Sequence, residues 1–382
     1  MSIQNKKIFL SLILMLNIFL LSACSFTKEE VETNVEEIVE EEPYNIEEVI
    51  KEYKPNELGD IPVIMYHAIL ENPPSVYQRS VEGFKEDLTY MYEHNYVTIS
   101  NSDYINFNIN VPAGKTPILI TFDDGEPGTF DLVKNEDGSY FPRKDTAIYL
   151  MEEFYKEHPD FGRNAILYIN GHQGTFNDEL TDQSIPLEDK INWLFDNGYE
   201  VSNHTSGHLN MSKSTNEEIQ KEIAQVDKQI KTIRPDVILN SIAYPFGARP
   251  KEGNDHVITN GSYDGYNYSY QIGFREGPSR PRFYPVICND FEPMNVPRLR
   301  GNKGELGDMW SYFEQYEQYP NQRFISDGNN KIVTIPDKKE SLIDYNKVKD
   351  LSVVVYNSET LEIINDDNSD TNETVNETKV LY

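Results

Sequence analysis

The chain is poor in cysteine, in basic residues and in long apolar runs, and each shortage narrows what it can be. Cys24 and Cys288 are its two cysteines, which allows one disulfide at most. Lys and Arg number 34 against 64 Asp and Glu, giving a formal net charge of −30. Nucleic acid is therefore not an expected partner, because phosphate binding needs a basic surface. The apolar run from Ile8 to Leu21 is well short of the ~20 residues that span a bilayer.

The first residues have instead the pattern of a secretory signal. Two lysines, the apolar run and a few small residues follow one another before Cys24. The ending Leu21-Ser22-Ala23-Cys24 resembles the lipoprotein box of bacteria, in which the cysteine is lipidated and becomes the mature N-terminus. We therefore expect residues 1–23 to be a signal peptide and Cys24 to anchor an extracytoplasmic protein to the bacterial cell membrane. Cys288 would then have no disulfide partner. The alternative is an ordinary cleaved signal with an incidental cysteine.

Acidic segments flank the body of the chain. Between Lys28 and Lys54 there are eleven glutamates and no long apolar stripe, so residues 24–55 are predicted to be a lipidated, extended linker. Residues 358–382 are rich in Asn, Asp, Thr and Glu and are predicted to be a disordered acidic tail. Residues 56–357 form one block without a linker-like break, which we interpret as a single catalytic domain.

Short apolar runs alternate with helical patterns through this block, which predicts a parallel sheet in an α/β fold. Its length suits a (β/α) barrel, for which ~250 residues are typical. The predicted strands are Ile61–Tyr66, Tyr96–Ile99, Pro117–Phe122, Ala165–Ile169, Glu200–Asn203, Asn240–Tyr244, Tyr270–Phe274 and Val296–Leu299. The predicted helices are Val81–Glu93, Asp145–Glu157, Leu187–Asn197 and Glu217–Ile233, the last after a capping box Ser214-Thr215-Asn216-Glu217. A turn at Asp327-Gly328-Asn329-Asn330 predicts a hairpin before a strand at Lys331–Ile335.

Two motifs at predicted strand ends carry the chemistry. Thr121-Phe122-Asp123-Asp124-Gly125 ends a buried strand, and alternation along a strand gives its two carboxylates different surroundings. His204-Thr205-Ser206-Gly207-His208 spaces two imidazoles so that they can meet on one side of a helical turn. One carboxylate and two imidazoles make a three-ligand site for a catalytic divalent metal, and the other carboxylate is a candidate base. The alternative is that the aspartates cap a helix and the histidines are ordinary.

Together with Tyr244-Pro245-Phe246-Gly247, these motifs resemble the polysaccharide deacetylases of carbohydrate esterase family four. The resemblance implies a distorted (β/α) barrel of the polysaccharide deacetylase type and a divalent metal, usually zinc. It assigns Asp124, His204 and His208 as ligands and Asp123 as catalytic base. It also assigns the third motif, Tyr244 and the backbone N–H of Phe246, to substrate and oxyanion binding. The implied partner is an acetylated glycan.

The chain departs from that family at two positions. It has no late Leu-x-His motif, but Tyr66-His67 resembles the N-terminal strand end of the permuted branch that deacetylates poly-N-acetylglucosamine. His67 is therefore predicted to be the general acid, the alternative being a core histidine. Ala243 stands where the family has an arginine that pairs with the catalytic aspartate. Arg298 is predicted to reach Asp123 from another strand, and Arg300 is the second candidate.

The sequence thus predicts a metal-dependent hydrolase that removes N-acetyl groups from N-acetylglucosamine units of a cell-wall or exopolysaccharide glycan. An O-acetyl glycan esterase is one alternative, because the same site can attack an ester. A non-catalytic glycan-binding lipoprotein with the same fold is the other.

Overall fold

The computed structural model describes residues 44–171, 175–176, 181–182, 184–279, 282–348 and 350–364. The predicted signal peptide, Cys24, most of the acidic linker and most of the acidic tail lie outside these residues. Residues from Asn45 onward form one compact unit. No helix among the described residues is long and apolar enough to cross a membrane.

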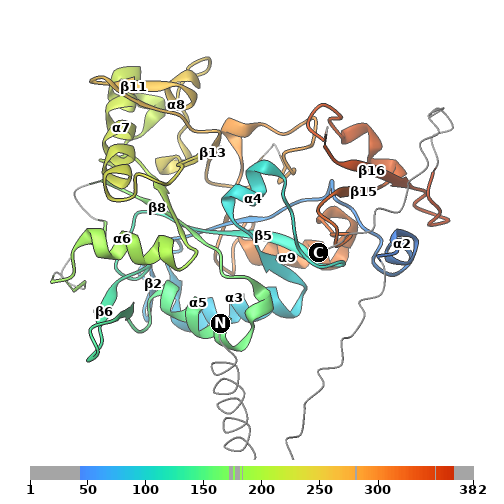
Figure 1. Cartoon of the computed structure of the whole chain (residues 1–382), viewed down its shortest axis with the longest axis horizontal. Coiled ribbons are helices and arrows are strands. Elements are labelled where there is room, and N and C mark those ends of the chain that lie inside the picture. Colours follow the sequence, from blue (N-terminus) through green and yellow to red (C-terminus); the bar gives the residue numbers. More distant parts are fainter. Residues whose placement is uncertain are drawn as a thin grey trace, which may run out of the picture. The chain divides into compact units, whose positions relative to one another are not determined.

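A ring of parallel strands forms the centre of this unit (Figure 1). The strands are β1 (Val63–Tyr66), β5 (Thr116–Phe122), β8 (Ile166–Ile169), β9 (Glu200–Asn203), β10 (Ser241–Ala243), β13 (Ile272–Phe274) and β14 (Leu299–Arg300). From β1 to β13 each of these strands pairs with the next one in chain order, and β14 pairs with β1. A bridge from Phe274 to Val296 links β13 to the segment leading into β14. The predicted distorted (β/α) barrel is therefore confirmed. The distortion includes β4 (Tyr96–Thr98), which pairs only with the first half of β5.

Alternate residues of each strand enter two different cores, as a pleated strand requires. Leu119 of β5 belongs to an inner cluster with Ile166 of β8. Its neighbour Ile120 belongs to an outer cluster, with side chains such as Phe84 from the surrounding helices. All seven residues of β5 are buried, so the strand next to the motifs is fixed from both sides.

The four predicted helices are present as α3 (Val81–Glu93), α5 (Ala147–Glu157), α6 (Leu187–Asp196) and α7 (Asn216–Ile233). The capping box of α7 lies one residue later than predicted. Thr215 is the N-cap and Glu218 closes the box, because the Thr215 hydroxyl, and not that of Ser214, faces the third backbone N–H of the helix.

Several shorter elements did not stand out from the sequence pattern. The helices are α2 (Ile46–Tyr53), α4 (Asn101–Asn106), α8 (His256–Thr259) and α9 (Met309–Gln318). The strands are β2 (Ile69–Leu70), β3 (Arg79–Ser80), β6 (Leu132–Lys134), β7 (Tyr140–Pro142), β11 (Gly261–Tyr263), β12 (Tyr266–Tyr268) and β16 (Ser352–Tyr356). The strand predicted at Lys331–Ile335 is present as β15 (Ile332–Pro336). α2 occupies the end of the predicted linker and buries Ile50.

The predicted hairpin at Asp327-Gly328-Asn329-Asn330 is wrong. The chain does turn there, with Gly328 at φ 84°, but β15 pairs in parallel with β16, which follows it in the chain. Beyond β16, Ile363 bridges back to Tyr356 and the Ile364 N–H donates to Val355 (2.8 Å). Ordered structure therefore continues into the first residues of the predicted tail.

Candidate active site

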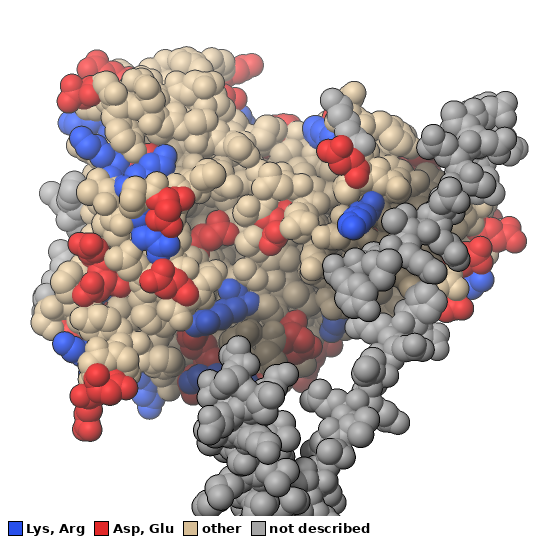
Figure 2. Space-filling model, in the orientation of Figure 1, with Lys and Arg blue, Asp and Glu red and all other residues tan. Residues whose placement is uncertain are grey.

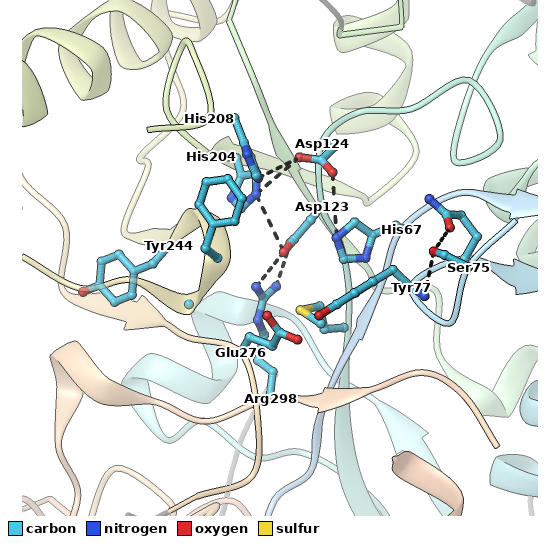
Figure 3. A pocket seen from close by; sticks show the side chains of 14 residues that line it. His67, Ser75, Tyr77, Asp123, Asp124, His204, His208, Tyr244, Glu276 and Arg298 are labelled. Atoms are coloured by element: carbon cyan, nitrogen blue, oxygen red, sulfur yellow. Dashed lines mark hydrogen bonds and ion pairs between the residues drawn. The ribbon is translucent and has the colours of Figure 1, made fainter. Parts of the chain in front are cut away.

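The carboxyl ends of the barrel strands meet around a cavity of about 310 Å³ (Figure 3). His67 follows β1, Asp123 and Asp124 follow β5, and His204 and His208 follow β9. All five line the cavity, which is where parallel α/β barrels place their reactive groups.

Asp124, His204 and His208 form the ligand group that the sequence predicts. One potential ligand atom from each lies within 4.8 Å of the other two. The Asp124 Oδ1 atom is 3.4 Å from His204 Nε2 and 3.5 Å from His208 Nε2. A carboxylate and two imidazoles are ligands that divalent transition metals share, so the residue types and their convergence fit a metal site.

The buried imidazole of His204 supplies a further test of that fit. Its Nδ1 lies 2.9 Å from the Ala243 carbonyl oxygen, so Nδ1 carries the proton and donates it. Nε2 then presents a lone pair, yet it is buried without a hydrogen-bond partner among the described residues. A histidine whose other nitrogen is held by a carbonyl is the usual arrangement of a metal ligand. The residues therefore fit a bound metal.

The two histidines do not meet on a helical turn, so that detail of the prediction is wrong. The segment is a loop in which Thr205 (φ 63°) and His208 (φ 51°) both have left-handed conformations. Asn203 accepts from the Thr205 N–H (2.8 Å), and the Thr205 hydroxyl accepts from the Leu209 N–H (2.9 Å). The carboxylate of Glu222 on α7 accepts from the Gly207 N–H. These contacts stabilise a conformation that the spacing alone did not reveal.

Asp123 and Asp124 both line the cavity. They can do so because β5 ends at Phe122 and the chain turns at Asp124. Asp124 has φ 72° and Gly125 has φ 69°, so the turn, and not strand alternation, directs the Asp124 carboxylate to the histidines. Asn170, which follows β8, donates from Nδ2 to Asp124 Oδ1 (3.1 Å). Sequence analysis missed Asn170, since an asparagine after a strand carries no distinctive signal.

Arg298 reaches Asp123 from inside the barrel, as chain position suggested. Its two terminal nitrogens donate to the two Asp123 oxygens at 2.7 and 2.6 Å, and one also donates to the Thr121 hydroxyl (3.1 Å). Such a two-pronged contact with an arginine fixes the orientation of the Asp123 carboxylate and also stabilises its negative charge. Burial alone would raise the pKa of Asp123, but Arg298 and then His204 outweigh it and lower the pKa to about 2.

Two other positions, Ala243 and Arg300, explain why Arg298 is the arginine that reaches Asp123. Ala243 is fully buried in the inner cluster, so its small side chain leaves room in the barrel. Arg300, the second candidate, turns elsewhere and pairs with Asp308 (2.7 Å) and Glu305. Arg298 is thus the arginine at the site.

His67 lines the cavity opposite His208, with Nε2 3.8 Å from the Asp124 Oδ2 atom. Its ring meets the edge of Tyr77 at 5.6 Å between centroids. The Tyr66 hydroxyl beside it in sequence donates instead to Asp87 (3.0 Å). His67 therefore faces the ligand group and not the core, although no described residue hydrogen-bonds its Nδ1.

The third motif, Tyr244-Pro245-Phe246-Gly247, places the Phe246 side chain beside His208 and turns the Tyr244 hydroxyl away from it. Phe246 is 62 % exposed and lies 4.4 Å from the His208 ring. Phe246 and Gly247 both have positive φ, and a Cβ at position 247 would come within 2.9 Å of the Glu276 nitrogen. The Tyr244 ring is buried and its hydroxyl donates to the Met294 carbonyl (3.3 Å). Packing directs this hydroxyl away from the ligand group (Figure 3). Tyr244 nevertheless lines the cavity, so its contact with substrate stays a prediction.

Fold and site together define an α/β barrel in which three residues that fit a metal ion lie beside an arginine-paired carboxylate. Residues 146–268 match the family model described as "Polysaccharide deacetylase". The matched segment contains His204, His208 and Phe246 and begins after Asp124. This segment of the chain is thus similar to polysaccharide deacetylases. No curated protein sequence matches it.

Solved structures of deacetylases are similar to the chain at low identity. A polysaccharide deacetylase from Bacillus cereus is 18% identical, with a TM-score of 0.48 over 67% of this chain and 69% of its own. IcaB from Ammonifex degensii is 16% identical, with a TM-score of 0.47 over 69% and 97% of the two chains. The Streptococcus pyogenes deacetylase PplD, in complex with acetate, is 15% identical, with a TM-score of 0.46 over 67% and 98%.

Proposed function

We propose that the protein is a metal-dependent hydrolase that removes N-acetyl groups from N-acetylglucosamine units of a cell-wall or exopolysaccharide glycan. The observation that carries this proposal is the placement of an arginine-paired aspartate, Asp123, against the group formed by Asp124, His204 and His208. Metal-assisted hydrolysis needs both parts, a metal site with an open position and an oriented carboxylate beside it.

Asp124, His204 and His208 would hold the metal, for which we propose Zn²⁺. A bound divalent ion there would polarise the acetyl carbonyl and make water a stronger nucleophile near neutral pH. The protein's part is to aim both imidazoles inward and to keep that of His204 neutral. Burial lowers the pKa of His204, which favours the neutral ligand form.

Asp123 would act as the base, and His67 as the acid that protonates the leaving amine. With its pKa lowered to about 2, Asp123 is ionised at neutral pH and able to accept a proton. Arg298 holds both of its oxygens, so the carboxylate cannot rotate away. The Phe246 N–H makes no hydrogen bond to the described residues and is free to donate to an oxyanion.

Acetate release from N-acetylglucosamine oligomers, with and without chelator, tests the proposal. We expect release by the purified protein, loss on chelation and recovery on adding Zn²⁺. The matched variant Asp123→Asn should bind metal but not release acetate. Release only from O-acetylated xylan would indicate an esterase instead, and metal binding without turnover on any acetylated glycan would indicate a binding protein.

We also propose export and a lipid anchor at Cys24, on the signal pattern alone. Expression in a bacterial host followed by fractionation tests this. The wild type should remain with the membrane, and Cys24→Ala should be released from it. A Cys24→Ala protein that stays membrane-bound would contradict the anchor.

A further inference from the structure

The cavity contains a carboxylate that the proposed reaction does not use. Glu276 follows β13 at the same end of the barrel as the ligand group and lines the cavity with His67 and Arg298 (Figure 3). It is not part of the metal-ligand group, and Asp123 and His67 already provide a base and an acid. An acetylated sugar is neutral, so it offers no cation with which the carboxylate of Glu276 could pair.

The backbone holds Glu276 in a fixed place on the cavity wall. Its nitrogen lies so close to Gly247 that the two segments pack directly together. Its carbonyl accepts from Arg275 Nη1 (3.1 Å). The next residue, Gly277, bridges Arg298. The side chain therefore starts from a defined point beside the ligand group.

The charge of Glu276 is not neutralised by the described residues around it. Arg298 donates to Asp123, and Arg300 pairs with Asp308 and Glu305. No ion pair to Glu276 is present among the described residues. Its charge, together with a hydrogen bond between the two side chains, raises the pKa of Tyr77. Tyr77 thus supplies a hydroxyl to Glu276 but no cation.

The proposed reaction itself produces the missing cation, and the inference rests on that reaction. Hydrolysis adds water across the C–N bond of the amide and yields acetate and a primary amine. Near neutral pH the amine takes up a proton and becomes an ammonium group. A glycan chain that has already reacted therefore carries positive charges next to acetylated units.

The overall acidity of the chain does not by itself select such a substrate. Acidic and basic side chains are interspersed on the face drawn in Figure 2, so no single acidic field dominates it. Selection between neighbouring sugar units needs a charge at a defined distance from the reacting unit, because exposed charges farther apart are screened by salt.

We infer that Glu276, with Tyr77 beside it, is a specificity-determining residue that binds the ammonium of a glucosamine unit next to the unit being deacetylated. The preferred substrate is then a partly deacetylated chain. A partly exposed ion pair contributes up to about 1 kcal/mol, so we expect a preference of up to roughly fivefold.

Binding tests this inference without requiring turnover. Calorimetry compares a fully deacetylated glucosamine oligomer with its acetylated counterpart on the wild type, Glu276→Gln and the control Glu314→Gln. Glu314 is an exposed acid of α9 that does not line the cavity. Wild type and control should bind the glucosamine oligomer up to roughly fivefold more tightly at low salt than Glu276→Gln does. Equal affinity of the wild type and Glu276→Gln would overturn the inference.

Kinetics provides the second measurement. The kcat/KM for acetate release is compared for a fully acetylated oligomer and for one of the same length with a single glucosamine unit. The ratio should favour the second substrate in the wild type and fall to about one in Glu276→Gln. An equal loss on both substrates would overturn the inference, since Glu276 would then only accept a sugar hydroxyl. If the wild type releases no acetate, the proposed reaction fails, and the binding comparison still decides the role of Glu276.

Discussion

Two carboxylates at opposite ends of the barrel, those of the buried Asp123 and the half-buried Glu200, have opposite pKa shifts. Asp123 follows β5 at the carboxyl end, and its pKa is lowered to about 2 because Arg298 and His204 outweigh burial. Glu200 begins β9 at the amino end, and burial raises its pKa to about 7. Near neutral pH the first is fully ionised, while the second is close to half protonated.

The difference shows that a paired cation can outweigh the effect of burial on the pKa of a carboxylate in this barrel. Glu200 accepts the Asn101 N–H (2.7 Å), and backbone amides lower its pKa only in part while Asp103 raises it. Asp123 has a guanidinium on both oxygens. The end of the barrel that carries the proposed chemistry is the end where a buried charge is paired.

The largest effect should come from removing the paired charge. Asp123→Asn takes away the proposed base and leaves Arg298 buried without its partner. We expect acetate release to fall by about 10²–10⁴-fold and the free energy of unfolding to fall by about 3–5 kcal/mol. Acetate assays and denaturant unfolding measure the two effects.

Glu200→Gln is the matched control, since it removes the charge of a carboxylate at the amino end of the barrel. Its acetate release should stay within about twofold of wild type, because Glu200 does not line the cavity. An Asp123→Asn protein that keeps more than a tenth of the activity would contradict the role of Asp123.

A smaller effect should follow from removing the cation and keeping the carboxylate. Arg298→Met leaves Asp123 buried without a guanidinium, so its pKa should rise from about 2. A base is lost as the pH falls through its pKa, so the acid limb of the pH–rate profile should move to higher pH. At mildly acid pH we expect a drop of about 10–100-fold in kcat/KM.

The control for this prediction is Arg298→Lys, which keeps the charge but not the two-pronged contact. Its acid limb should move less than that of Arg298→Met. If the limb does not move in Arg298→Met, Asp123 is not the group that the profile reports.

A double variant tests whether an arginine at position 243 can pair with Asp123 in place of Arg298. Ala243 and Arg298 both lie inside the barrel, so Ala243→Arg could restore a cation to Arg298→Ala. We expect a coupling of about 1–3 kcal/mol between the two changes in kcat/KM. Additive losses would show that the barrel has no room for a guanidinium from β10.

Sequence reasoning identified most of the barrel because its signals are local. Buried strands read as short apolar runs, and helices such as Val81–Glu93 carry their own caps and periodicity. The short strands outside the barrel, such as β6 and β11, carry no such pattern. The turn before β15 shows the limit, because turn residues indicate a reversal but not which strand becomes the partner.

The site was predictable in its residue types but not in its geometry. Aspartate and histidine pairs at strand ends indicated the ligands, and the absence of the usual arginine directed attention to Arg298. The conformation of the loop at Thr205 and His208 depends on backbone N–H groups that donate to the side chains of Asn203 and Glu222. Such contacts leave no spacing pattern in the sequence, which is also why Glu276 was missed.

The last expected effect is on the free energy of unfolding and concerns Glu200, at the amino end of the barrel. The pKa of Glu200 is 4.5 in an unperturbed chain and about 7 in the fold. Between these values the folded protein holds more protons than the unfolded one, so stability falls as the pH rises from about 4.5 to 7. The shift corresponds to at most about 3 kcal/mol, fully lost above pH 7.

Glu200→Gln should abolish that slope, since an amide does not titrate and its oxygen can still accept the Asn101 N–H. Urea unfolding at pH 4, 6 and 8 measures it. The variant should match the wild type at the lowest pH and exceed it by up to about 3 kcal/mol at the highest. A wild type that gains stability from pH 4 to 8 relative to the variant would mean that Glu200 is paired like Asp123, and the contrast between the two ends would not hold.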